Sequence, residues 1–240
     1  MRKIISFFCI LWAIQVNAHA IWIETNTRAK LGDTHEVRVF FGEPNQRETP
    51  TPTENWYSDL NTLTLSLISP SGKTIELEKK QAKDYYYAHF QVEEQGVYKL
   101  NINHLVARVY KRMVLRYQAV AFVTTSDTNE NIILGDKKFF QLGVNTISQT
   151  NEQIYHSFYK NRPFKNENVV FDISKEKYIK QMTDKKGKII LSNEETHEYI
   201  VNLARQKKNK GTHNDRKHLF EYTWLTFLFH NEEKITQLTE

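Results

Sequence analysis

The histidine at position 19 offers the clearest chemistry in this sequence, because of the residues that precede it. Val16, Asn17 and Ala18 place small residues where a signal peptide is cut. If cleavage falls after Ala18, the mature chain begins with His19, whose free α-amine and imidazole can hold one metal ion together. One further imidazole would complete a three-nitrogen site suited to Cu(II) or Ni(II). Both nitrogens must be unprotonated, so the affinity for metal should fall as the pH decreases.

His104 is predicted as the second metal ligand. It follows the expected strand Tyr98 to Ile102, and the end of a strand can face a chain terminus. No His-Glu-x-x-His, cysteine pair or calcium-loop pattern occurs, so the predicted metal ligands are His19 and His104.

Other residues of the first half could replace His104 or add an oxygen ligand: His35, His89, Glu24 and Glu43. His35 and His89 alternate with apolar residues, which favours side chains that simply face solvent. Two later histidines lie in a basic stretch and are expected to be solvated: His213 and His218.

Residues 1–18 have the pattern of a secretory signal peptide. Arg2 and Lys3 form a short positive region, and an apolar run of 13 residues extends from Ile4 to Val16. A membrane helix needs about 20 apolar residues, so we expect a cleaved leader and an exported protein, periplasmic or secreted, without a membrane span in the mature chain. A cut before Ile21 fits the small-residue rule equally well, and it would remove His19 with the leader.

Cysteine usage and charge narrow the function classes. Cys9 lies inside the leader, so the mature chain has no disulfide framework, thiolate metal site or cysteine nucleophile. The chain has 33 basic and 28 acidic residues; without Arg2 and Lys3, 31 basic residues remain and the net charge is +3. The late basic clusters are interrupted by acidic residues, which favours a solvated face over a nucleic-acid surface.

Short strands and turns account for the rest of the chain. Leu63 to Leu67 and Thr74 to Glu78 flank a strong turn and predict a hairpin. Turn signals recur at roughly 10-residue spacing, which is typical of immunoglobulin-like sandwiches. We therefore predict an all-β protein with two immunoglobulin-like β-sandwich domains in tandem, after the signal peptide. The domains are residues 19–125 and 132–232, a polar linker covers 126–131, a weak helical pattern covers 176–182, and a charged loop covers 207–216.

Several stretches resemble a family of exported bacterial proteins, the nickel-uptake-transporter family, much of which is a domain of unknown function. The resemblance begins with His19-Ala20-Ile21-Trp22-Ile23-Glu24-Thr25, continues through Gly32 and residues 37–43, and is similar again at 158–164 and 183–187. It covers most of residues 19–229. The resemblance implies an export signal, β-sandwich domains and a link to transition-metal handling.

These observations predict a non-enzymatic accessory protein that binds or delivers nickel or copper through His19, with an envelope transporter or receptor as a possible partner. The alternative is a structural or ligand-binding β-sandwich module of the cell envelope without metal. A copper-dependent polysaccharide oxidase, which also begins with a mature histidine on a β-sandwich, is a third hypothesis. No nucleophile elbow, phosphate-binding loop or dinucleotide fingerprint is present.

Overall fold

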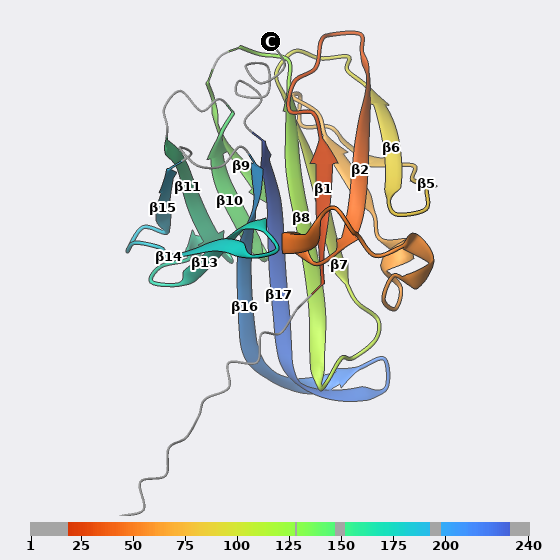
Figure 1. Cartoon of the computed structure of the whole chain (residues 1–240), viewed down its shortest axis with the longest axis vertical. Helices are drawn as coiled ribbons and strands as arrows, with labels where there is room; N and C mark the ends of the chain where they lie inside the picture. Colours follow the sequence, from red (N-terminus) through yellow and green to blue (C-terminus); the bar gives the residue numbers. More distant parts are fainter. Residues whose placement is uncertain (1–18, 128, 147–151, 193–197, 231–240) are drawn as a thin grey trace, which may run out of the picture.

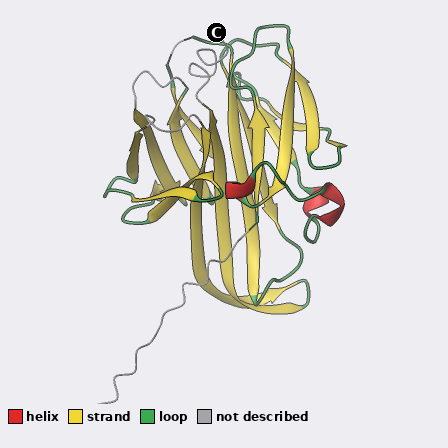
Figure 2. Cartoon of the chain, in the orientation of Figure 1, coloured by secondary structure: helices red, strands yellow, loops and turns green. Residues whose placement is uncertain are grey.

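The computed structural model describes residues 19–127, 129–146, 152–192 and 198–230, so the predicted leader lies outside the described residues. Strands make up most of this structure, and Figure 2 shows them in yellow. The short 3-10 turns η1 (Pro44–Gln46), η2 (Thr53–Asn55) and η3 (Leu60–Thr62) all follow the second strand. The prediction of an all-β protein is confirmed. In the described residues, no helix is long and apolar enough to cross a bilayer.

The first small sheet has the strand order β1-β2-β6-β5. Its strands are β1 (Ala20–Thr25), β2 (Thr34–Gly42), β6 (Tyr86–Gln91) and β5 (Lys80–Gln81). Val37, Val39 and Phe41 of β2 are buried at alternating positions, because successive side chains of a strand point to opposite faces. The period-two pattern in the sequence therefore defines the face that packs inward.

The central sheet has eight strands in the order β14-β13-β16-β17-β8-β7-β3-β4. They are β14 (Lys177–Met182), β13 (Asn168–Ser174), β16 (Glu198–His213), β17 (Arg216–His230), β8 (Met113–Thr124), β7 (Val97–Leu105), β3 (Leu65–Ile68) and β4 (Thr74–Leu77). The predicted hairpin is present as β3 and β4. β8 and β17 pair in parallel in the middle of the molecule, as Figure 1 shows.

The second small sheet has the strand order β12-β11-β10-β9, and β15 also pairs with β11. Its strands are β9 (Asn131–Gly135), β10 (Phe140–Asn145), β11 (Glu152–Tyr159), β12 (Arg162–Pro163) and β15 (Lys188–Ser192). The two small sheets pack over different parts of the central eight-stranded sheet.

Two hydrophobic cores fill the space between the layers. The first contains Ile21, Val39, Leu65 and Tyr117, from the first small sheet and from β3, β7 and β8. The second core contains residues of the second small sheet and of β13, β16 and β17, and also Phe122 of β8. The two cores do not follow the bounds of the two predicted domains, because Val120 and Phe122 of the first range belong to the second core and Trp224 of the second range belongs to the first. The continuous central sheet joins the two cores. That sheet was not part of the prediction.

Two segments differ from their sequence predictions. Residues 207–216, expected as a charged loop, mostly continue β16 and β17 as a long hairpin, visible at the bottom of Figure 1. Residues 177–182, where a helical pattern was noted, form β14 at the edge of the central sheet. In both cases pairing with a neighbouring strand overrides the local sequence preference.

Candidate binding site at His19

A cavity opens on the face of the central sheet beyond the beginning of β1. The long strands β8, β16 and β17 extend past that point, so no described strand of the first small sheet crosses this area (Figure 1). The cavity has a volume of about 490 Å³. We call it the His19 cavity; its lining residues are His19, Phe41, Thr51, Asn55, Tyr57, Tyr110, Met113, Leu115, Tyr117, Gln206, Tyr222 and Trp224.

The floor of the His19 cavity is aromatic because of the period of the strands. Tyr222 and Trp224 occupy alternate positions of β17 and therefore share one face, whereas Leu225 points into the second core. Leu115 and Tyr117 of β8 do the same next to them. The sequence shows this alternation of side chains in β8 and β17. It does not show which part of the central sheet stays uncovered, because that depends on where β1 begins. For that reason the sequence did not predict Tyr110, Gln206 and Tyr222 as site residues.

His19 lies at the wall of this cavity. The residue is exposed, and its ring centroid lies 5.3 Å from that of Phe41. The next residue, Ala20, is fully buried and pairs with Gly42 in the β1–β2 ladder. Because the ladder begins at Ala20, the main chain of His19 is held beside the cavity opening.

Two cations stand over the rings of tyrosines that line the cavity. The Arg108 guanidinium lies 5.9 Å from the ring centre of Tyr57, and the Lys111 ammonium lies 5.2 Å from that of Tyr110. The two tyrosine rings meet edge to face at 6.0 Å. Burial raises the pKa of the Tyr57 phenol above its ordinary value, against the opposing charge of Arg108. The phenol is therefore neutral at physiological pH.

His104, the predicted second ligand, does not line the His19 cavity among the described residues. Its side chain is 12% exposed, and its Nε2 lies 3.3 Å from Oδ2 of Asp59. Burial acts to raise the pKa of Asp59, but hydrogen bonds from the Ala107 N–H and the Ser58 hydroxyl, together with the charge of His104, lower it overall. The described structure therefore pairs His104 with the carboxylate of Asp59.

The remaining histidines have other surroundings. His35 is buried, its Nε2 lies 2.8 Å from the Thr25 hydroxyl, and its ring packs on Phe90, so the expectation that it faces solvent is wrong. His89 does face solvent, and its Nε2 lies 3.2 Å from a carboxylate oxygen of Glu36.

Both histidines of the basic hairpin have protein contacts. A ring nitrogen of His213 hydrogen-bonds the Val106 carbonyl at 3.0 Å. His218 is buried, against the expectation of a solvated side chain. Its ring lies so close to Gly211 that a Cβ there would stand 2.9 Å from the imidazole. The missing side chain of Gly211 thus makes room for His218.

The two carboxylates suggested as oxygen ligands, Glu24 and Glu43, accept hydrogen bonds from other side chains. Glu24 accepts a hydrogen bond from the Trp22 indole at 2.8 Å, and burial raises its pKa despite that bond. Glu43 lines a second, smaller hollow. Neither is among the residues that line the His19 cavity in the described structure.

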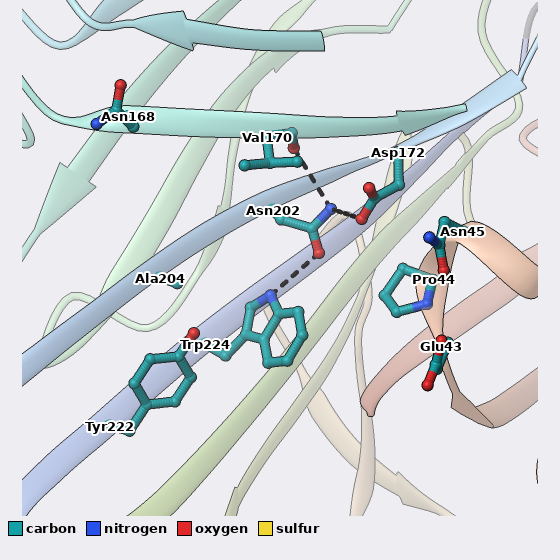
Figure 3. Close-up of a pocket in the computed structure, with 10 residues that line it drawn as sticks. All are labelled: Glu43, Pro44, Asn45, Asn168, Val170, Asp172, Asn202, Ala204, Tyr222 and Trp224. Atoms are coloured by element: carbon teal, nitrogen blue, oxygen red, sulfur yellow. Dashed lines mark hydrogen bonds between the residues drawn. The ribbon is translucent and has the colours of Figure 1, made fainter. Parts of the chain in front are cut away.

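The second hollow, about 250 Å³ in volume, shares Tyr222 and Trp224 with the His19 cavity. Figure 3 shows Asn202 at its centre: the amide nitrogen donates to Asp172 Oδ2 at 2.9 Å, and the amide oxygen accepts from the Trp224 indole at 3.0 Å. Burial raises the pKa of Asp172 to about 6, although the Asn202 bond and the Arg47 charge oppose this. The network fixes the Trp224 indole, which lines both hollows.

The donor set decides how a metal ion could be held. Among the described residues, no group of three His, Cys, Asp or Glu side chains could hold a metal ion. At the His19 cavity, a free terminus would give one residue with two nitrogen donors, surrounded by neutral aromatic walls. The donors fit a transition metal, but they leave its coordination sphere incomplete.

Comparisons with known proteins give no family for this chain. No family model matches the sequence, and no curated protein matches it. One solved structure that is similar in part is a DUF4785 family protein from Legionella pneumophila, with 11% sequence identity and a TM-score of 0.31. The match covers 70% of this chain and 45% of the other, so this chain spans less than half the length of that protein.

Proposed function

We propose that this chain is an exported, non-enzymatic binding protein that captures a transition-metal ion, nickel or copper, at a mature N-terminal His19. The observation that carries the proposal is the position of His19 beside an aromatic cavity, one residue before a fixed strand. The α-amine and the imidazole would bind the ion as a chelate. An envelope transporter or receptor would receive the metal.

The burial of Ala20 supports the cleavage site that this proposal needs. A cut before Ile21 would remove a fully buried residue and its pairing with Gly42. A cut before His19 keeps the whole of β1. Sequencing the mature N-terminus tests this directly, and we expect His19 as the first residue; Ile21 would refute the proposal.

Calorimetric titration of the mature protein with Ni(II) and Cu(II) tests the site itself. We expect one ion per chain, with an affinity that decreases as the pH falls below about 7.7–8.0, where the α-amine becomes protonated. His19→Ala should abolish this binding. His89→Ala, which removes another exposed histidine, is the matched control and should leave it intact. Equal binding by the wild type and His19→Ala would refute the role of His19.

The role of His104 is tested in the same titration. Because its Nε2 pairs with Asp59 and neither residue lines the His19 cavity, we expect His104→Ala to change the affinity for metal by less than about threefold, and to lower the free energy of unfolding by about 1–3 kcal/mol. A loss of affinity comparable to that of His19→Ala would instead make His104 the second ligand that the sequence predicts.

A ligand-binding module without metal is the second candidate function. The observation that favours it is that Tyr222 and Trp224 line both the His19 cavity and the hollow at Asn202, since aromatic surfaces with a few polar groups are typical of small-molecule sites. Failure of both metals to bind the mature protein would favour this function. The oxidase hypothesis requires turnover of a polysaccharide with copper and a reductant, and an assay on the copper-loaded protein tests it.

A further inference from the structure

The lining of the His19 cavity indicates the charge of the ligand that it could hold. Besides His19, the described lining consists of six aromatic residues, two apolar residues and three uncharged polar residues, and it includes no Asp, Glu, Lys or Arg. A charged ligand loses its hydration on burial and needs an opposite charge in return. The lining therefore favours a neutral ligand. The volume of about 490 Å³ lies within the roughly 300–1,000 Å³ of small-molecule sites.

Four tyrosine hydroxyls belong to this lining, and they decide what else the ligand must offer. Tyr117 is only 7% exposed, and burial raises the pKa of its phenol. The phenols of Tyr57, Tyr110 and Tyr222 act on it in the same direction, which places them near it. Within the described part of the chain, none of the four hydroxyls has a hydrogen-bond partner. A ligand that covers them without bonding them loses free energy, so the ligand must carry hydrogen-bonding groups.

The rings of the cavity stand at angles to one another. Tyr117 and Trp224 are tilted by 39°, and Tyr222 meets Trp224 edge to face at 85°. Tyr57 and Tyr110 also meet edge to face, at 84°. A flat aromatic ligand gains most from stacking face to face on a ring, and none of these described pairs offers two parallel faces. Angled walls suit a saturated ring, which has C–H groups on its faces and polar groups around its edge.

Two amides complete the polar part of the lining. Asn55 and Gln206 both line the cavity, and both residues are exposed. An amide side chain offers two donors and one acceptor, and a hydroxyl group both donates and accepts. The amides and the tyrosine hydroxyls can therefore bond several hydroxyl groups of one ligand.

We propose that the His19 cavity binds a neutral carbohydrate, one or a few uncharged sugar units of a glycan. The C–H faces of the sugar contact the rings of Tyr110 and Tyr222, and its hydroxyls bond Tyr117 and the amides of Asn55 and Gln206. This binding requires no metal. The inference rests on the second candidate function, a ligand-binding module without metal, and names the class of its ligand.

Calorimetric titration of the mature protein with neutral oligosaccharides, in buffer with EDTA, tests the inference. The probes are short oligomers of glucose, mannose, galactose and N-acetylglucosamine, with adenosine as a flat neutral probe. We expect at least one sugar to bind with a Kd below about 1 mM. Tyr117→Phe, which removes only a hydroxyl, should weaken this binding about fivefold. Tyr110→Ala, which removes a partly exposed ring, should weaken it about tenfold.

Two tyrosines outside the cavity lining provide matched controls. Tyr86→Phe removes a hydroxyl from a buried tyrosine of the first core, and Tyr178→Ala removes an exposed ring from β14. Both should leave the affinity within twofold. Sugar binding that Tyr117→Phe and Tyr110→Ala change no more than these controls would overturn the inference.

The remaining outcomes separate this inference from the functions proposed above. If adenosine binds and no sugar does, the carbohydrate inference is overturned and the ligand-binding function stands. If neither binds, both are overturned. The titrations with Ni(II) and Cu(II) are made without sugar, so they report on the metal function of His19 independently.

Discussion

At the scale of single residues, a cluster of three charged side chains lies where β16 and β17 meet the turn after β2. Glu198 contacts Arg47 Nη2 at 2.6 Å and His230 Nδ1 at 2.9 Å. Burial acts to raise the pKa of Glu198, but the hydrogen bond and charge of His230 and the charge of Arg47 lower it to about 2. Burial likewise acts to lower the pKa of His230, and Glu198 reverses this and raises it.

The stabilisation from this pair should depend on pH. The Glu198 contribution is present above the ordinary pKa of 4.5 and is lost as the pH falls toward about 2. The His230 contribution is present below the ordinary pKa of 6.5 and is lost as the pH rises through its raised value. Glu198→Gln should therefore cost most between these two ordinary values, about 1 kcal/mol given the partial exposure of Glu198.

Urea denaturation of the wild type and Glu198→Gln across a pH series measures this difference. Glu167→Gln, which removes an exposed partner 3.9 Å from Arg205, is the control and should have little effect at any pH. A difference between wild type and Glu198→Gln that stays constant from acid to alkaline pH would contradict the assignment.

At the scale of elements, the hairpin of β16 and β17 depends on a two-residue turn. Asn214 and Asp215 have φ values of 45° and 60°, and the flanking residues His213 and Arg216 pair with each other. Two consecutive left-handed residues are typical of a type I′ turn, which matches the twist of the strands. The Asn214 amide also donates to the Ala107 carbonyl at 3.0 Å and ties the tip to the rest of the molecule.

Substitutions at Asp215 test this account of the hairpin. Asp215→Gly should raise the free energy of unfolding by about 0.5 kcal/mol, because glycine takes a positive φ without a Cβ clash. Asp215→Ala should lower it by about 1 kcal/mol, because alanine tolerates this conformation poorly. Chemical denaturation measures both, and the opposite order of the two variants would show that the turn conformation does not limit stability.

The hairpin also shows what the sequence could and could not predict. The turn between β3 and β4 is a local signal, and the hairpin predicted from it is confirmed. The abundant charge of residues 207–216 is also a local signal, and it predicted a loop. The structure of these residues depends instead on the Asn214–Asp215 turn and on the pairing of Lys207 with Glu221. For the site, His19 was predicted from its own chemistry, whereas the cavity beside it depends on how far β8 and β17 extend past β1. That is a tertiary property.

At the scale of the whole molecule, the parallel pairing of β8 with β17 links the two halves of the sequence. The register runs from Phe220 paired with Met113 to Phe227 paired with Val120. Val120 and Phe122 belong to the second core although their strand lies in the first predicted domain. Trp22, Phe40, Ile200 and Leu228 form a further cluster from both halves. Separation into two independent domains would expose these surfaces.

We therefore expect the described structure to unfold as one cooperative unit. Leu142→Ala in the second core should lower the free energy of unfolding by about 2–5 kcal/mol, because Leu142 is fully buried. The tryptophans at positions 22, 56 and 224 lie outside that core, so their fluorescence reports on the first core and on the Trp22 cluster. Its urea midpoint should nevertheless shift together with the far-UV circular dichroism signal. Ile133→Ala, at a 49% exposed position of the same small sheet, is the control. The free energy of unfolding measured by either signal should change by no more than about 0.5 kcal/mol. An unchanged fluorescence midpoint in Leu142→Ala would mean that the halves unfold separately, as the tandem-domain prediction implies.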